Sequence, residues 1–143
     1  MYIVSCCLLG VNCKYSGGNN RNEKVLQFLS DKEYVAVCPE VRGGLPIPRT
    51  PAERVGDKVL TKDGRDVTSE YAVGAELCLQ YVKAYAEELG EEIEGAILKN
   101  NSPSCGFRSI YDGTFSGKTI EGNGVFAEKL LAEGINIKTE KEI

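Results

Sequence analysis

The chain has 143 residues, 42% of them hydrophobic, and a formal net charge of −4. This length suits one domain, residues 1–143, that buries its own core without covalent staples. The Lys and Arg residues are scattered, which argues against a nucleic-acid polymer as partner. No apolar run approaches the roughly 20 residues that span a bilayer, and the first residues lack a basic, cleavable signal. We therefore expect a cytoplasmic protein without a membrane partner.

Three short apolar runs predict buried strands. The first covers residues 2–4, the second residues 34–38 and the third about 95–99. Each run leads into a segment rich in Gly, Pro, Asn or Ser, which is typical of a strand followed by a loop. A fourth strand is expected at 135–137, after the last helix.

Three helices are expected between these strands. The spacing of apolar residues predicts helices at about 21–30, 69–89 and 123–133. Asn20 or Asn22, then Thr68, then Asn123 are the expected N-caps, and Gly90 and Gly134 the expected ends of the last two helices.

The segment 39–51 holds four of the five prolines and is predicted to be an ordered loop, and a loop or hairpin is expected through residues 111–115. Strands that alternate with helices favour an α/β fold: a three-layer domain with a mostly parallel sheet. In such sheets ligand sites lie at the carboxyl ends of the strands.

Cysteines follow all three of the predicted strands, and the chain contains no histidine. Cys7, Cys38 and Cys105 each stand at or after the end of an apolar run. If those ends share one edge of the sheet, the three thiols converge, and thiolates are the ligands that soft metals prefer. The pattern therefore predicts a metal site at the carboxyl ends of the strands.

The other three cysteines have different predicted roles. Cys78 lies on the apolar stripe of the long helix, which is typical of a core residue. Cys6 is expected to point away from Cys7, because adjacent residues of a strand face opposite sides unless the strand has already ended. Only one of the two is then a ligand, and Cys7 is the better candidate. Cys13, in a polar loop, could equally be a fourth ligand, a reactive thiol or a surface residue.

Polar residues near these cysteines are candidates for chemistry. Without histidine, proton transfer near neutral pH falls to a carboxylate, Lys, Tyr or Cys. Glu40 follows Cys38 by two residues and is the candidate proton donor or acceptor. Arg49 could hold Glu40 or an anionic ligand, and Lys99 could add positive charge at the same edge.

Two serines flank Pro103 just before Cys105. Ser102 and Ser104 suit an ordinary turn, but either hydroxyl could also reach a ligand that Cys105 holds.

Several sequence blocks resemble one bacterial family, once catalogued as of unknown function, that includes the thiouracil desulfurases. The similarity spans nearly all of residues 3–140, and its blocks keep one order along the chain: Ser5-Cys6-Cys7-Leu8-Leu9-Gly10, Cys38-Pro39-Glu40, Gly43-Gly44-Leu45-Pro46-Ile47-Pro48-Arg49, Asp66-Val67-Thr68, Ser102-Pro103-Ser104-Cys105-Gly106 and Tyr111-Asp112-Gly113-Thr114-Phe115. One departure is Cys6, where the family pattern more often has a small residue.

The resemblance implies a [4Fe-4S] cluster held by only three cysteines, which fall on Cys7, Cys38 and Cys105. One iron is then free for the sulfur of a substrate. The catalytic acid and serine of the family fall on Glu40 and Ser102. The implied activity is non-redox, hydrolytic desulfuration of a thiolated nucleobase such as thiouracil, or of a similar small thiocarbonyl.

Two alternatives stay open from the residues themselves. A sulfur transferase would pass the sulfide to an acceptor. A non-catalytic protein would hold a structural zinc with Cys7, Cys13, Cys38 and Cys105, because zinc takes four ligands in structural sites.

Overall fold

The computed structural model describes residues 1–143 and has a four-stranded parallel sheet at its centre. Its strands are β1 (Tyr2–Ser5), β2 (Tyr34–Val37), β5 (Gly95–Leu98) and β8 (Ile137–Thr139), in the order β2-β1-β5-β8. The predicted mostly parallel α/β fold is therefore confirmed. The last strand begins two residues later than expected.

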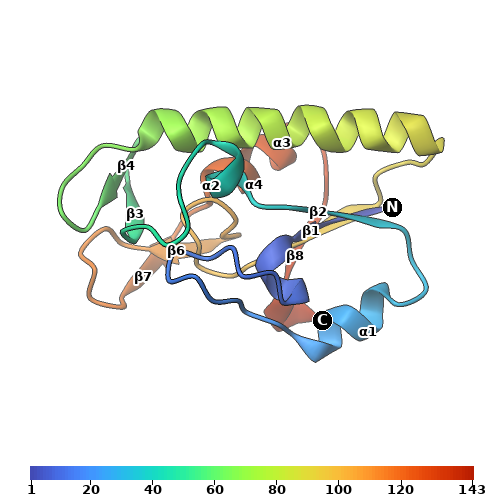
Figure 1. The fold of residues 1–143 in the computed structure, drawn as a ribbon, viewed down its shortest axis with the longest axis horizontal. Coiled ribbons are helices and arrows are strands. Elements are labelled where there is room, and N and C mark those ends of the chain that lie inside the picture. The colour runs from blue at the N-terminus through green and yellow to red at the C-terminus, as the bar shows by residue number, and fades with distance from the viewer.

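Helices cover both faces of the sheet (Figure 1). The long helix α3 (Thr68–Leu89) and α4 (Val125–Ala132) pack on one face, and α1 (Glu23–Leu29) packs on the other. Alternate strand residues divide between the two cores, since Ile3 and Leu98 contact the α3 side whereas Val4 and Ile97 contact the α1 side. The predicted three layers are present.

The predicted helix caps are only partly right. Asn22 caps α1 as expected, because its side chain accepts a hydrogen bond from Val25 N at 3.1 Å. Thr68 is not the cap of α3: Val67 holds that position, and Thr68 Oγ1 instead accepts from Val59 N at 2.9 Å. Gly90 ends α3 in the left-handed conformation, as expected.

The cap of α4 also differs from the prediction. Gly124 takes this position, while Asn123 Oδ1 accepts from Arg108 N at 2.9 Å. The first turn of α4 is satisfied by main-chain carbonyls, because Val125 N donates to Pro103 O, and Phe126 N to Ser104 O. The N-terminal end of α4 is therefore fixed to the loop that carries Cys105.

Two antiparallel hairpins lie beside the main sheet. One joins β3 (Ala52–Val55) to β4 (Lys58–Thr61), and the other joins β6 (Ser109–Tyr111) to β7 (Thr119–Glu121). The second is the hairpin expected around residues 111–115. The first was not expected, because each of its strands has only four residues and they include the charged residues Glu53, Arg54 and Lys58.

The prediction of a loop throughout 39–51 is wrong at its start, where α2 (Pro39–Arg42) forms one helical turn. Pro39 suits the first turn of a helix, where a missing N–H costs nothing. The 3-10 turns η1 (Cys6–Leu9) and η2 (Glu140–Glu142) complete the fold.

Two glycines let α2 lie against the backbone of α3. A Cβ at Gly74 would overlap the carbonyl oxygen of Pro39, and a Cβ at Gly43 would overlap that of Glu70. Neither site is in the left-handed region, so close approach is the reason for glycine here. This contact sets the position of α2, and with it Cys38 and Glu40.

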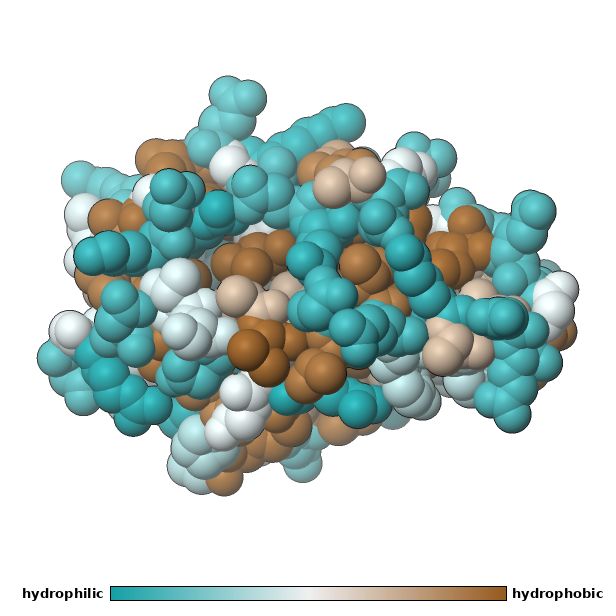
Figure 2. All heavy atoms as spheres, turned by 90° about the horizontal axis from the view of Figure 1, so that it is seen from above, coloured by the Kyte–Doolittle hydropathy of each residue, from teal (hydrophilic) through white to brown (hydrophobic).

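The face covered by α3 is shown in Figure 2, where apolar side chains are interrupted by hydrophilic ones. No helix is long and apolar enough to cross a membrane.

Gly74→Ala should destabilise the fold by about 2 to 3 kcal/mol, because the new methyl group overpacks the contact between α2 and α3. Helix propensity alone predicts the opposite sign, a gain of roughly 1 kcal/mol. Urea unfolding measures the difference. The exposed Glu88→Ala, on the same helix, is the control and should stay within about 0.5 kcal/mol of wild type. A neutral or stabilising Gly74→Ala would contradict the packing argument.

Candidate metal and active site

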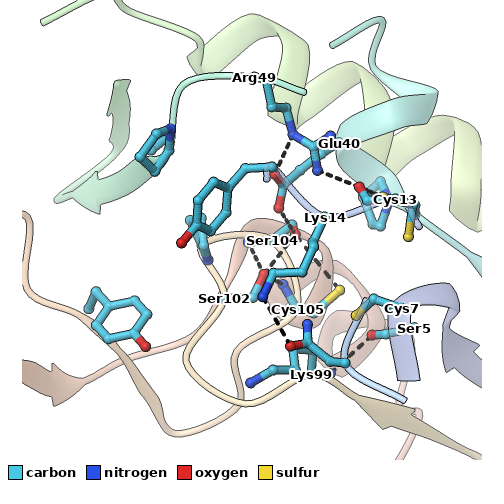
Figure 3. Close-up of a pocket in the computed structure, with 18 of the residues that line it drawn as sticks. Ser5, Cys7, Cys13, Lys14, Glu40, Arg49, Lys99, Ser102, Ser104 and Cys105 are labelled. Carbon is cyan, nitrogen blue, oxygen red and sulfur yellow. Dashed lines mark hydrogen bonds and ion pairs between the residues drawn. The ribbon is translucent and has the colours of Figure 1, made fainter. Parts of the chain in front are cut away.

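A cavity of about 440 Å³ opens at the carboxyl ends of β1, β2 and β5, where Figure 3 shows its walls. Ligand sites of open α/β sheets lie at this edge. Five cysteines are among the residues that line it: Cys6, Cys7, Cys13, Cys38 and Cys105. The convergence that the strand ends suggested is therefore present.

Cys6 and Cys7 lie in η1, directly after β1. The strand has already ended at Ser5, so the exception to strand alternation applies, and alternation across a sheet does not separate the two side chains. Both are half-buried. The turn ends at Gly10, whose φ of 93° places it in the left-handed region that glycine favours.

Cys38 occupies the N-cap position of α2, in an extended conformation. Its thiol lies 3.9 Å from the carbonyl oxygen of Cys13. Cys13 is buried, so a surface role for it is excluded, and its thiol shares the cavity with Cys38. The choice between fourth ligand and reactive thiol stays open.

Cys105 is buried on a loop that close backbone contacts hold in place. A Cβ at Gly124 would overlap the main chain of Ser104, and one at Gly106 would meet Ser102 O at 2.7 Å. Together with the bonds to the first turn of α4, these contacts fix the loop 102–106.

Cys78 does not belong to the site. It is fully buried within the core that α3 and α4 form on the sheet, as expected from its position on the apolar stripe.

Four of the cavity thiols, those of Cys7, Cys13, Cys38 and Cys105, have raised pKa values and favour their neutral form when no cation is present. Burial raises the pKa of Cys7 and of Cys105. The neighbouring Cys13 thiol, followed by burial, raises the pKa of Cys38. For Cys13, contact with Cys38 lowers the pKa, but contact with Cys6 and burial outweigh it and bring the value to about 12. A bound metal cation would favour the thiolate over the neutral thiol, because cysteine binds metals in its deprotonated form.

Glu40 and Arg49 form a nearly buried ion pair, with 14% and 6% of their side chains exposed. Arg49 Nε donates to Glu40 Oε1 at 3.1 Å. The guanidinium also donates to Cys13 O at 2.8 Å and to Pro46 O at 3.2 Å. Arg49 thus joins α2 to the loop of Cys13, and its expected contact with Glu40 is present.

The second oxygen of Glu40 contacts a serine of the Cys105 loop. Ser104 Oγ donates to Glu40 Oε2 at 2.8 Å, and Ser104 is only 2% exposed. Ser102 Oγ lies 2.9 Å from Ser104 Oγ and accepts from the N–H groups of Ser104 and Cys105 at 3.2 and 3.1 Å. Ser102 lines the cavity but reaches Glu40 only through Ser104. The sequence left open which of the two hydroxyls reaches a ligand, and the family resemblance implied the catalytic role for Ser102.

Lys99 adds positive charge at the cavity wall, as expected from its place at the end of β5. Its ammonium lies 3.3 Å from Glu140 Oε2 and donates to Asn100 O at 3.0 Å. Its main-chain N–H donates to Ser5 Oγ at 3.0 Å, which ties the ends of β5 and β1 together.

Four aromatic residues also line the cavity: Tyr15, Tyr71, Tyr111 and Phe115. The hairpin that carries the last two is held by Glu53, whose Oε1 accepts from Gly113 N and Phe115 N at 3.0 and 3.1 Å. Burial, and then the charge of Glu40, raise the pKa of Tyr71. Sequence reasoning missed Tyr71 and Glu53, since nothing in the local sequence distinguishes them from core and hairpin residues.

No three Cys, Asp or Glu side chains lie close enough together to hold a single metal ion. A structural zinc needs four such ligands around one centre. An iron-sulfur cluster instead binds each cysteine to a different iron, so its ligands stand further apart around a shared space. Several cysteines from different segments line this one cavity.

The fold and the cysteine-lined cavity indicate an α/β protein with a candidate metal site at the carboxyl ends of its parallel strands. The family model described as 2-thiouracil desulfurase matches residues 2–142, and the chain belongs to that family. The resemblance seen in the sequence is thereby confirmed.

Two relatives extend this result. The uncharacterized protein YbbK of Bacillus subtilis (strain 168) is 42% identical, over 100% of this chain and 97% of the relative. Among solved structures, the [4Fe-4S]-dependent thiouracil desulfidase TudS is 40% identical with a TM-score of 0.84, over 99% of this chain and 91% of that one.

Arg49→Met should lower the free energy of unfolding by about 3 kcal/mol, because it leaves the carboxylate of Glu40 nearly buried without its partner. Adding Glu40→Gln should recover a large part of the loss, since no charge then stays unpaired. Denaturant unfolding of the metal-free wild type, both single variants and the double variant measures this coupling. If the losses of unfolding free energy in the two single variants simply add up in the double variant, the interaction between Glu40 and Arg49 contributes nothing to stability.

Proposed function

We propose that this protein is a [4Fe-4S]-dependent desulfurase that removes sulfur hydrolytically, without a redox change, from a thiolated nucleobase such as thiouracil or from a similar small thiocarbonyl. The observation that carries the proposal is the convergence of three strand-end cysteines on one cavity whose wall also holds Glu40 and Ser102. Family membership and the likeness to the thiouracil desulfidase TudS support it.

Cys7, Cys38 and Cys105 are the proposed ligands of the cluster. They come from three separate strand ends, and the donor set is of the soft type that iron-sulfur clusters take. When bound, a cluster held by only three protein thiolates supplies one Lewis-acidic iron that is open to a thiocarbonyl sulfur.

The polar residues of the cavity have separate proposed roles. Glu40 exchanges a proton through Oε2, because its other oxygen is occupied by Arg49. Ser102 lines the cavity and orients the substrate. The aromatic residues of the wall offer flat apolar surfaces that suit a planar ring.

The charged side chains of the cavity wall are held in place by partners. Lys99, Arg49 and Glu40 each have a partner within the protein, so their charges are fixed rather than free to reorganise around the reacting groups. We expect the protein to act in the cytoplasm on a small molecule.

Anaerobic purification should give a coloured protein with about four irons and four acid-labile sulfides per chain, as a [4Fe-4S] cluster requires. Cys13→Ala should keep this cluster, whereas Cys7→Ala, Cys38→Ala and Cys105→Ala should each lose most of it. Cys78→Ala, in the core, is the matched control and should keep it. Iron, sulfide and zinc analysis measures the result. A colourless protein with stoichiometric zinc and no sulfide would identify the structural-zinc alternative instead.

Glu40→Gln should keep the cluster and slow the conversion of 2-thiouracil to uracil by about 100-fold or more, the scale of general acid–base catalysis. The assay follows the loss of thiocarbonyl absorbance and the release of sulfide. Glu23→Gln, an exposed residue of α1, is the control. Unimpaired turnover by Glu40→Gln with an intact cluster would remove Glu40 from the mechanism. Recovery of the substrate's sulfur in an acceptor molecule, instead of as free sulfide, would favour the sulfur transferase.

A further inference from the structure

Glu53 is a nearly buried carboxylate without a cation beside it. It lies on β3, is 8% exposed and lines the cavity. Two other largely buried carboxylates have a cationic partner, since Arg49 binds Glu40 and Lys99 binds Glu140. No ion pair of the structure involves Glu53. A buried carboxylate needs a cation or hydrogen bonds to offset its lost hydration, so its two oxygens must be considered one by one.

One oxygen of Glu53 is occupied by the turn between β6 and β7. Oε1 accepts from Gly113 N at 3.0 Å and from Phe115 N at 3.1 Å. Gly113 has a φ of 94° and Phe115 a φ of 56°, so both lie in the left-handed region, where a residue as bulky as Phe is uncommon. A Cβ at Gly113 would meet Val55 Cγ2 at 2.7 Å. The turn thus lies close against β3 and directs two N–H groups at Oε1.

The other oxygen of Glu53 has no partner within the protein. Both hydrogen bonds of the carboxylate end on Oε1, and none ends on Oε2. Every fully buried side-chain oxygen and nitrogen of the protein has a partner, so Oε2 keeps some accessible surface. Since Glu53 is only 8% exposed and lines the cavity, the cavity accounts for that surface. Oε2 is therefore an acceptor that is available to a bound molecule.

A carboxylate oxygen selects a ligand that donates a hydrogen bond. An ionised carboxylate has no hydrogen and can only accept. Hydrogen bonds with one ionised partner are shorter and stronger than neutral ones, and an environment screened from water strengthens them further. In a cyclic thioamide or thiourea, the thiocarbonyl carbon is bonded to a ring N–H that lies in the ring plane. Such an N–H is a suitable donor to Oε2, and Phe115, whose turn Oε1 holds, adds an apolar surface to the same wall.

We propose that Glu53 is a specificity-determining residue: Oε1 fixes the turn that carries Phe115, and Oε2 accepts the ring N–H of the substrate. The preferred substrates are then small cyclic thioamides and thioureas with a free N–H next to the thiocarbonyl. N-alkylated rings, thioketones and thioesters, which lack this donor, are poor substrates. The inference rests on the proposed function for its consequence in turnover, whereas ligand binding tests it separately.

The first test measures binding without turnover. Uracil has the ring N–H groups of 2-thiouracil but no sulfur to lose, so its binding to the cluster-loaded protein can be followed by equilibrium dialysis. The isomers 1-methyluracil and 3-methyluracil have equal bulk, and each lacks one N–H. The wild type should bind one isomer about as well as uracil and the other at least about tenfold more weakly, the scale of a hydrogen bond to a charged group. Equal binding of the two isomers, or no binding of uracil, would overturn the inference.

The variant Glu53→Gln assigns the contact to this side chain, because glutamine has one acceptor oxygen in place of two. That oxygen can accept from the turn or from the ligand, but not from both. The ratio of affinities for the two isomers should therefore fall by about tenfold in Glu53→Gln. Glu121→Gln, at an exposed position of β7, is the matched control and should leave the ratio unchanged. Circular dichroism and iron content verify that both variants are folded and loaded, and the wild-type comparison of isomers needs no variant.

The second test follows desulfuration of 2-thiouracil and its two N-methyl isomers. The wild type should prefer 2-thiouracil to the isomer that lacks the contact by about 10- to 100-fold in kcat/KM, and Glu53→Gln should lose most of this preference, mainly through KM. A preference that is unchanged in Glu53→Gln would overturn the inference while the desulfurase assignment stands. Uracil binding that depends on Glu53, in a cluster-loaded protein that desulfurises none of these compounds, would instead refute the proposed function and leave the binding role of Glu53 in place.

Discussion

The ion pair between Glu40 and Arg49 is the interaction on which the rest of the cavity depends. A nearly buried carboxylate is tolerated only with a cation beside it, and Arg49 provides that cation while it binds the carbonyl oxygens of Cys13 and Pro46. One guanidinium thereby joins the helical turn after β2, the loop after β1 and the proline-rich segment. The cost of leaving Glu40 unpaired is what keeps these three segments together.

The cavity is built from loops, yet its loops are fixed by main-chain contacts. Gly43 and Gly74 bring α2 against α3, and Gly124 brings α4 against the loop of Cys105. Such contacts leave little freedom for the thiols that the loops carry, since the backbone itself is in van der Waals contact. Lys99 N and Ser5 Oγ add a hydrogen bond between the ends of two neighbouring strands. A site on loops therefore gains the rigidity that catalytic geometry needs.

The sequence predicted much of this arrangement, and the reasons for its failures are physical. Apolar runs in β1, β2 and β5 and the stripe of α3 are strong local signals, so the parallel sheet and the layers around it were predictable. The cap at Thr68 was wrong because its hydroxyl bonds to Val59, nine residues away, rather than to its own helix. Likewise, Ser104 and Glu40 are 64 residues apart, and only the fold brings them into contact. Spacing along the chain cannot predict such long-range partners, although it placed each residue beside a cysteine of the predicted site, Glu40 near Cys38 and Ser104 next to Cys105.

The two hairpins stand apart from the parallel sheet, and they contribute a different kind of wall. Tyr111 and Phe115 belong to the region of β6 and β7, whereas the cysteines follow strands of the central sheet or the loops attached to them. The strand β6 itself packs on the loop of Cys105, because a Cβ at Gly106 would meet Ser109 O at 2.8 Å. Only the turn between β6 and β7, which carries Phe115, projects from this contact, so the shape of the opening can vary at the turn while β6 stays tied to the thiol-bearing loop.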